Sequence, residues 1–275
     1  PDSPSFVREL VYGVLKNKFL LDWFIQQLVP SGLKKVKKQD LMLLRMGVYQ
    51  ISYMESVPEY AAVSETVEMA KKLARGRERF INGVLRGFIR NRQQLVLPDK
   101  EKGALEYLSV MYSTEKWIVK LWIDAYGEKK AEELLKASNE TPELSIRVNV
   151  MKTDRDSLRK RLEALGFEAA ESKVSERALL VKGSGLLDSK PYRDGLFSVQ
   201  DEASILASDM LGAQPGETVA DVCAAPGGKT FATAELMAGE GVIYAMDKYE
   251  HKLKLMEAQA KRAGIDNIRL LEHDS

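Results

Sequence analysis

The chain has 275 residues, with 41 Lys+Arg against 40 Asp+Glu, 45% hydrophobic residues, two His and one Cys. This length predicts about two domains, and this apolar fraction excludes a disordered chain. One Cys cannot form an internal disulfide, and one Cys with two His cannot form the usual structural zinc site, so we expect no metal. No apolar run reaches about 18 residues, and the first residues lack the pattern of a signal peptide, so we expect a cytoplasmic protein without membrane contact. We also expect a monomer.

The net charge of +1 conceals an asymmetry along the chain. Residues 1–98 carry 16 Lys+Arg and 9 Asp+Glu, whereas residues 99–275 carry 25 and 31. A basic part joined to an acidic part indicates an anionic partner, most often a nucleic acid, although a solvated helical surface gives the same excess. Two clusters are candidates for RNA contact, and the sequence does not choose between them: Lys34, Lys35, Lys37 and Lys38, and Arg75, Arg77 and Arg79.

Residues 1–98 are predicted to form a small all-helical domain, because apolar residues recur at four-residue spacing and no strand alternation appears. Gly and Pro residues separate the helices. The predicted helices run over 6–29, over 41–54 with Asp40 as N-cap, from about Val63 to Gly76, and through Phe80, Val84 and Phe88.

Two smaller segments follow a linker at residues 97–100. Residues 99–140 are predicted to form two or three helices with Trp117, Leu121 and Trp122 in their core, rather than stacked on bases. Residues 141–200 are predicted to form a small α+β domain. Its expected elements are strands over 144–149, 178–181 and 196–199, and a helix over 157–165 that ends at Gly166.

From residue 201 the pattern becomes β-α-β-α-β, which predicts a parallel sheet with right-handed crossovers. A doubly wound domain usually has five or more strands, so we expect the sequence to end inside a domain, with an uncovered sheet edge. The first residue is not Met, so we also expect an upstream segment to have been removed. The predicted elements are a helix over 202–211, strands over 218–222, 242–246 and 268–271, and helices over 230–238 and 249–263.

The most informative segment is the loop between the first of these strands and the helix that follows it, DVCAAPGGKT at 221–230. Adjacent glycines allow close approach of backbone to a ligand, and a helix N-terminus offers unpaired N–H groups. A phosphate-binding P-loop requires Gly at position 223, where this chain has Cys223. The dinucleotide fingerprint G-x-G-x-x-G also fails on spacing.

A nucleoside cofactor without phosphates remains as the third interpretation. Asp247 follows the second strand, where it can accept hydrogen bonds from ribose hydroxyls, and Asp274 follows the third, within reach of an adenine amino group. S-adenosylmethionine fits this pattern, because its sulfonium cation suits an acidic pocket. The competing interpretation is of ordinary loops in which the aspartates cap helices.

The motifs around this loop resemble one known family. FSVQDEAS at 197–204 followed by DVCAAPGGKT at 221–230 resembles the RsmB/Sun (Fmu) family of small-subunit rRNA cytosine-C5 methyltransferases. LRMGVYQI at 44–51 and FINGVLR at 80–86 are similar to the NusB-type RNA-binding helical domain. ETPELSIRVN at 140–149 is similar to that family's bridge into its middle domain, so the resemblance covers essentially the whole chain.

The resemblance implies a multidomain fold. Its parts would be an all-α NusB-like RNA-binding domain over 1–98, a helical linker subdomain over 99–140, a small α+β domain over 141–200, and the start of an incomplete α/β Rossmann-like S-adenosylmethionine-dependent methyltransferase domain over 201–275.

The resemblance also implies roles for particular residues. Asp247 would hold the cofactor's ribose and Asp274 its adenine, and the region of Arg147 would offer a contact to substrate ribose or phosphate. The methionine part of the cofactor would be lined by Cys223, Ala224, Ala225, Pro226, Gly227, Gly228 and Lys229.

Enzymes of this family are understood to add a Cys thiolate to carbon 6 of cytosine, which activates carbon 5 toward the methyl group. We expect that nucleophile after Ser275, and no catalytic residue within the chain. Cys223 is the only thiol, and its place in the cofactor motif favours a packing or cofactor-shaping role.

Two further functions remain open from the sequence. A non-catalytic NusB-like RNA-binding or assembly factor with a vestigial methyltransferase domain would also carry these motifs. So would a methyltransferase with another RNA target, since fold alone does not determine the substrate.

Overall fold

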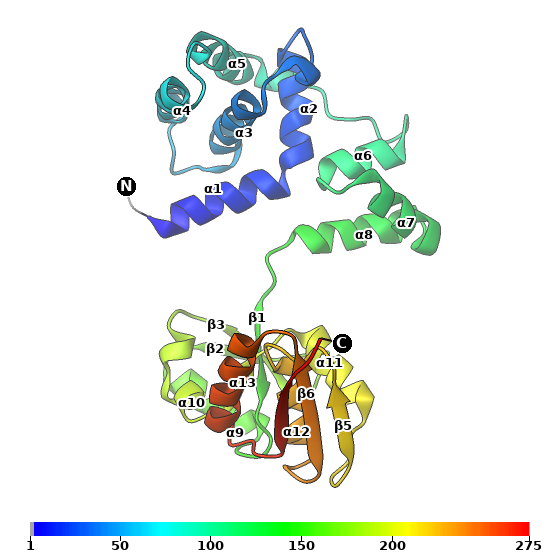
Figure 1. Ribbon diagram of the computed structural model, residues 1–275. Helices are drawn as coiled ribbons and strands as arrows, with labels where there is room; N and C mark the ends of the chain where they lie inside the picture. The colour runs from blue at the N-terminus through cyan, green and yellow to red at the C-terminus, as the bar shows by residue number, and fades with distance from the viewer. Residues whose placement is uncertain (1–2, 275) are drawn as a thin grey trace. The chain divides into compact units, whose positions relative to one another are not determined.

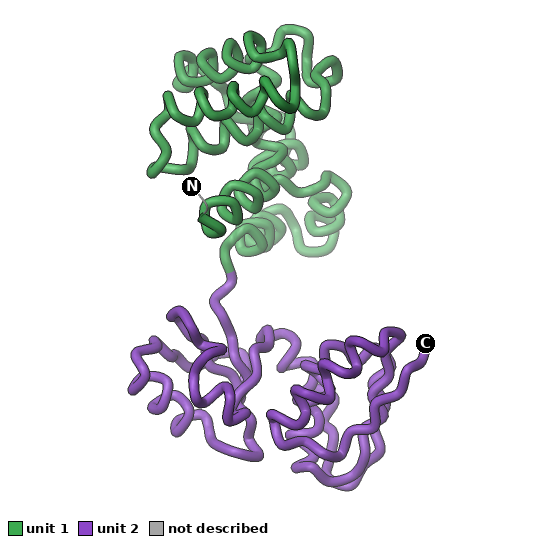
Figure 2. Tube along the Cα trace, turned by 60° about the vertical axis from the view of Figure 1, so that its left-hand side comes forward, with its two compact units in different colours: residues 1–141 green, residues 142–275 purple. Residues whose placement is uncertain are grey.

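The computed structural model describes residues 3–274. They form two compact units that divide between residues 141 and 142 (Figures 1 and 2). The first is all-helical, and the second holds two sheets with helices. This is the multidomain fold class predicted from the sequence. Within residues 3–274, no helix combines the length and the apolar character needed to cross a membrane.

The first unit consists of α-helices joined by short loops and two 3₁₀ turns. In chain order its α-helices are α1 (Pro4–Lys16), α2 (Lys18–Leu28), α3 (Lys38–Tyr53), α4 (Glu59–Leu73), α5 (Glu78–Asn91), α6 (Ala104–Met111), α7 (Lys116–Tyr126) and α8 (Glu128–Asn139). The 3₁₀ turns are η1 (Leu33–Lys35) and η2 (Arg92–Gln94).

The single helix predicted over 6–29 is wrong, because the chain breaks at Asn17 into α1 and α2, which run in different directions (Figure 1). The side-chain amide of Asn17 donates to the carbonyl of Gly13 at 2.9 Å. The backbone N–H of Phe19 is taken by the Ser113 hydroxyl at 3.1 Å. The Ser113 bond takes the place of the helical bond of the Phe19 N–H, and the Asn17 side chain caps the Gly13 carbonyl, which also accepts from the Asn17 backbone N–H.

Helices α1–α5 enclose one apolar core, in which Leu21, Ile25 and Leu44 have no exposed surface. Asp40 is not the predicted N-cap, because α3 begins at Lys38 and places Asp40 in its first turn. Its carboxylate is buried, and the Arg77 guanidinium donates to it at 2.8 Å. This ion pair joins the start of α3 to the start of α5.

Helices α6–α8 form a smaller core around Leu108, Val119 and Leu135. Trp122 packs against it as predicted, but Trp117 and Leu121 do not belong to it, since 67% and 56% of their surfaces are exposed. The apolar residues of α7 cover more than one face, and only the face of Val119 and Trp122 meets the neighbouring helices.

The second unit begins with a four-stranded antiparallel sheet of order β2-β3-β1-β4. Strand β2 carries Glu168 and Glu171 and lacks the apolar alternation that predicts strands, so the sequence did not reveal it. The elements of this part are β1 (Leu144–Val148), α9 (Arg155–Ala164), β2 (Glu168–Glu171), β3 (Ala178–Lys182), η3 (Leu186–Asp188), α10 (Lys190–Arg193) and β4 (Phe197–Val199).

A three-stranded parallel sheet of order β5-β6-β7 completes the unit, as the β-α-β pattern predicted. Helices α12 and α13 connect its strands and share its core, where Ala234, Ile243 and Met256 are fully buried. The elements are α11 (Glu202–Leu211), β5 (Thr218–Asp221), α12 (Gly228–Leu236), β6 (Val242–Asp247), α13 (Glu250–Ala263) and β7 (Ile268–Glu272).

The packing of α1 against α3 depends on the absence of a side chain at Gly13. A Cβ added there would lie 1.9 Å from Cζ of the Tyr49 ring, whereas a Cβ at the exposed helical Gly83 would meet nothing within 4 Å. We expect Gly13→Ala to lower the free energy of unfolding by about 1–3 kcal/mol through overpacking. Gly83→Ala is the matched control and should raise it by about 0.5–1 kcal/mol. Urea unfolding measures both, and equal effects would contradict the close contact.

Candidate functional site

The predicted cofactor loop is closed by the carboxylate of Asp221 at the end of β5. One oxygen accepts from the Thr230 hydroxyl at 2.7 Å and the other from the backbone N–H of Cys223 at 3.3 Å. Asp221 therefore ties the first turn of α12 back to the strand. The sequence analysis quoted Asp221 within the motif but assigned it no role.

Gly227 gives this loop its shape. It has φ +101° and serves as N-cap of α12, and a Cβ there would lie 2.5 Å from the Phe231 ring. Its backbone N–H donates to the Ala224 carbonyl at 2.7 Å. Only glycine meets both demands without strain. Because Gly227 has no side chain to cap the helix, the first N–H groups of α12 remain available to a ligand.

The ends of all three parallel strands meet at this loop. One carboxylate oxygen of Asp247, at the end of β6, accepts from the Ala225 N–H, and the other accepts from the Tyr249 N–H, both at 3.2 Å. The backbone carbonyl of Asp247 accepts from the His273 N–H just after β7, also at 3.2 Å. The structure thus brings Asp247 together with the loop.

The remaining predicted contact residues lie around this point. Asp274 is exposed, and its carboxylate pairs with the Lys248 ammonium at 2.8 Å. Cys223, Pro226 and Lys229 are exposed on the loop, whereas Ala224 and Gly227 are buried and Ala225 and Gly228 half-buried. Asp274 follows β7, and its carboxylate is paired with Lys248, the residue directly after β6.

A cavity of about 560 Å³ lies beside the loop, between α11, α12 and β5. The loop residues from Asp221 to Ala225, with Pro226 and Gly228–Thr230, form part of its wall. Gln200 and Ser208 contribute from the opposite side, and Val219 and Ile243 from the sheet. The cavity has room for a nucleoside-sized ligand. Among residues 3–274, no group of His, Cys, Asp or Glu side chains is arranged to hold a metal ion.

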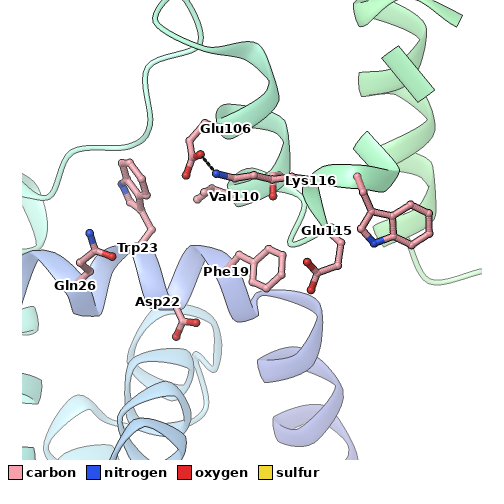
Figure 3. A pocket seen from close by; sticks show the side chains of 10 residues that line it. Phe19, Asp22, Trp23, Gln26, Glu106, Val110, Glu115 and Lys116 are labelled. Atoms are coloured by element: carbon pink, nitrogen blue, oxygen red, sulfur yellow. Dashed lines mark hydrogen bonds and ion pairs between the residues drawn. The ribbon is translucent and has the colours of Figure 1, made fainter. Parts of the chain in front are cut away.

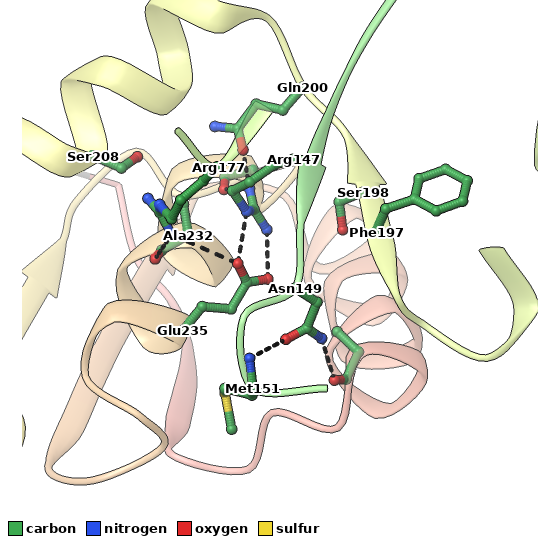
Figure 4. Close-up of polar contacts among 12 residues, drawn as sticks. Arg147, Asn149, Met151, Arg177, Phe197, Ser198, Gln200, Ser208, Ala232 and Glu235 are labelled. Atoms are coloured by element: carbon green, nitrogen blue, oxygen red, sulfur yellow. Dashed lines mark hydrogen bonds and ion pairs between the residues drawn. The ribbon is translucent and has the colours of Figure 1, made fainter. Parts of the chain in front are cut away.

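Arg147 on β1 lies behind this site and is completely buried (Figure 4). Its guanidinium makes two bonds to the Glu235 carboxylate, at 2.8 and 2.9 Å, and one to the Gly228 carbonyl at 2.9 Å. A fourth bond reaches the side-chain oxygen of Gln200. The expected contact from Arg147 to substrate is therefore wrong, because its side chain is fully buried and four of its five N–H groups donate to protein acceptors.

Arg147 was expected to contact substrate and Asn149 was given no role from the sequence, but both side chains are buried links within the second unit. They stand two residues apart and so project from the same side of the backbone. The Asn149 amide donates to the Ala263 carbonyl at the end of α13 at 2.8 Å. The signal available in the sequence was the strict alternation of polar Ser145, Arg147 and Asn149 with apolar Leu144, Ile146 and Val148.

The two basic clusters lie at the N-termini of two helices. Lys34 and Lys35 belong to η1, and Lys37 and Lys38 begin α3; all four are exposed. Arg75 is exposed in the turn before α5, Arg77 is the N-cap of that helix, and Arg79 is exposed in its first turn. The Arg77–Asp40 ion pair holds the two helix starts together. The clusters are therefore parts of one surface of the first unit.

A second hollow, of about 380 Å³, lies in the first unit between α2, α6 and α7 (Figure 3). Phe19 and Trp23 line it together with Asp22, Glu106 and Glu115. The indole N–H of Trp23 is already bonded to the Val96 carbonyl at 2.8 Å. Acidic side chains outnumber basic ones here, so this hollow is not suited to an RNA backbone.

Three family models match successive parts of the chain. Residues 1–90 match the NusB family, and residues 115–186 match the ferredoxin-like domain of RsmF/B-like methyltransferases. Residues 208–275, which include the loop and Asp247, match the 16S rRNA methyltransferase RsmB/F family. The chain belongs to the RsmB/F family. The family resemblance and the fold class that were predicted from the sequence are confirmed.

Relatives of this RsmB/F chain support the assignment. A probable ribosomal RNA small subunit methyltransferase B of Bacillus subtilis is 38% identical over 96% of the chain and 59% of its own length. A probable ribosomal RNA small subunit methyltransferase B of Synechocystis is 33% identical over 100% of the chain and 62% of its own length. The crystal structure of PH0851 is 27% identical, with a TM-score of 0.74, and covers 98% of the chain and 60% of that protein. The chain thus spans about 60% of the length of these relatives.

The buried ion pair of this RsmB/F chain gives a test of its energetics. We expect Glu235→Leu to lower the free energy of unfolding by about 3–5 kcal/mol, because it leaves the buried Arg147 guanidinium without a counter-charge. Arg147→Met should cost somewhat less, because Glu235 keeps a longer ion pair with Arg177 at 3.8 Å. The double variant should recover most of the loss, because apolar side chains of similar volume replace a buried pair at little cost. Urea unfolding of the three variants measures this.

The exposed Lys190–Asp194 pair supplies the control for that series, since its ammonium and carboxylate are 2.8 Å apart in solvent. Lys190→Met should change stability far less than either buried substitution. Additive losses in the double variant would contradict the coupling between Arg147 and Glu235.

Proposed function

We propose that the protein to which this chain belongs transfers the methyl group of S-adenosylmethionine to carbon 5 of cytosine in 16S rRNA. The observation that carries the proposal is the hydrogen bond from the Ala225 N–H of the glycine-containing loop to Asp247. Other residues of the same loop line a nucleoside-sized cavity, although Asp247 itself is not part of its wall. The loop and Asp247 lie in the region that matches the RsmB/F methyltransferases. The names of the relatives support an rRNA substrate of the small subunit.

The residues present fit this cofactor. Gly227 and Gly228 open the backbone at the start of α12, and the Gln200 amide nitrogen is buried in the cavity wall, with no hydrogen-bond partner among residues 3–274. We assign the ribose to Asp247, the adenine to Asp274, and the methionine part to the loop from Cys223 to Lys229. The cofactor supplies an electrophilic methyl group on its sulfonium, and the loop orients it.

Cys223 is assigned a cofactor-shaping role in this proposal. Its backbone N–H donates to Asp221, and its side chain belongs to the loop that lines the cavity. A thiolate that adds to carbon 6 of cytosine must approach from the side of the base, away from the loop that holds the cofactor. We therefore assign the covalent nucleophile to a cysteine outside residues 1–275.

We assign RNA binding in the first unit to the surface formed by the two basic clusters. Neither α3 nor α5 has a side chain that caps its first N–H groups. Each helix N-terminus carries a partial positive charge, which adds to that of the lysines and arginines. Cations at such positions oppose the helix dipole, and phosphate groups would relieve that repulsion.

Replacing Lys34, Lys35, Lys37 and Lys38 by Gln tests this surface. The slope of log Kobs against log salt for RNA binding should become shallower by about 0.7–0.9 for each lysine that contacts a phosphate. The control replaces four exposed lysines of α7 and α8, namely Lys116, Lys120, Lys129 and Lys130. An unchanged slope in the first variant would show that the cluster is only solvated surface.

A labelled-methyl assay with the full-length protein and 16S rRNA tests the activity. We expect label from S-adenosylmethionine to appear in 5-methylcytosine after nucleoside digestion. Label in guanine, adenine or protein alone would contradict the cytosine assignment. RNA binding without any transfer would favour the alternative function, a NusB-like RNA-binding or assembly factor with a vestigial methyltransferase domain.

A further inference from the structure

Gln200 connects β4 to α11 and is held on both its backbone and its side chain. Its backbone N–H donates to the Ser145 carbonyl at 3.3 Å, and its backbone carbonyl accepts from the Ser145 hydroxyl. Its side-chain oxygen accepts from the Arg147 guanidinium. Only 8% of the residue is exposed. The position of this side chain is therefore fixed by β1.

The orientation of the Gln200 amide follows from the chemistry of its neighbour. A guanidinium has only donor groups, so the amide atom that faces Arg147 must be the oxygen. The amide nitrogen then points away from Arg147 (Figure 4). It is buried, and no group within residues 3–274 accepts a hydrogen bond from it. A buried donor of this kind calls for an acceptor.

The unpaired nitrogen lies at the cofactor loop. A Cβ added at Gly228 would be 3.5 Å from it, so the amide rests against the backbone at the first residue of α12. Gln200, Gly228 and Lys229 line the same cavity. Two independent features thus converge here, an uncapped helix N-terminus and a fixed, unpartnered amide donor.

The groups around this point select the chemistry of the ligand. The first N–H groups of α12, the Gln200 amide and the exposed Lys229 ammonium are all donors, and Lys229 is a cation. A small anion with several acceptor positions satisfies them, and a carboxylate has that form. Asp247, an acceptor, lies at the other side of the loop, where it suits hydroxyl donors.

We propose that Gln200 is a cofactor-binding residue that donates a hydrogen bond to the amino-acid carboxylate of S-adenosylmethionine. The proposal rests on the proposed function, because it requires that cofactor. Arg147 is the positioning residue: it holds the Gln200 oxygen and the Gly228 carbonyl, and so fixes both sides of the carboxylate position.

Calorimetry with two ligands tests the assignment on the full-length protein. S-adenosylhomocysteine carries the carboxylate. 5′-Methylthioadenosine has the same nucleoside but lacks the α-carboxylate and α-amino group of the amino-acid part. We expect Gln200→Ala to weaken S-adenosylhomocysteine about 10-fold, as for a hydrogen bond to a charged group, and to leave 5′-methylthioadenosine unchanged. Asp247→Ala should weaken both ligands.

Gln200→Glu provides a variant that retains the oxygen facing Arg147. Its carboxylate should repel that of S-adenosylhomocysteine, so binding should fall more than in Gln200→Ala, while 5′-methylthioadenosine binds nearly as before. Thermal unfolding of each variant verifies that it is folded.

The outcomes separate the two proposals. Equal binding of S-adenosylhomocysteine to wild type and both Gln200 variants would overturn the role of Gln200 and leave the cofactor assignment intact. Equal loss of both ligands in the Gln200 variants would also overturn it, because the effect would not involve the carboxylate. If the wild type binds neither ligand, the proposed function fails, and this inference fails with it.

Discussion

The second unit depends on one buried ion pair, between Arg147 of the antiparallel sheet and Glu235 of α12. Removing two charges from water is costly, and the cost is met only when every donor and acceptor is engaged. The guanidinium comes close to this demand, because four of its five N–H groups donate to Glu235, Gly228 and Gln200. Gly228 and Glu235 stand seven residues apart, two turns of one helix face, so a single side chain sets the position of α12 and of the loop before it.

Much of the fold and part of the candidate site could be predicted from the sequence. Strands and helices of the second unit follow from alternation and glycine stops, and the place of Asp247 follows from the rule that parallel strands end at one edge. The partners of Arg147 could not be predicted, because pattern does not tell which element covers a strand. The same reason explains Trp117, whose spacing is helical but whose face remains open.

In the first unit, the sequence likewise could not tell which charged residues lie close together in space. The lysines near residue 36 and the arginines near residue 77 are far apart in the sequence, and counting charges gave no reason to group them. Their proximity depends on Asp40, whose buried carboxylate needed a cation and found it in Arg77. Asp40 was predicted to cap one helix, and it instead links the first turn of α3 to the N-cap of α5.

The antiparallel sheet is attached to the helices of the parallel sheet at two places. Arg147 of β1 bonds to Glu235 of α12, and Asn149, just after β1, bonds to the carbonyl at the end of α13. This double attachment limits how the two could be recombined during evolution. If the antiparallel sheet were joined to another nucleoside-binding domain, Arg147 would be buried without a counter-charge. The new domain would need an acidic residue two turns into the helix that corresponds to α12. The two sheets are therefore coupled structurally, and we expect that one could not be exchanged without matching changes in the other.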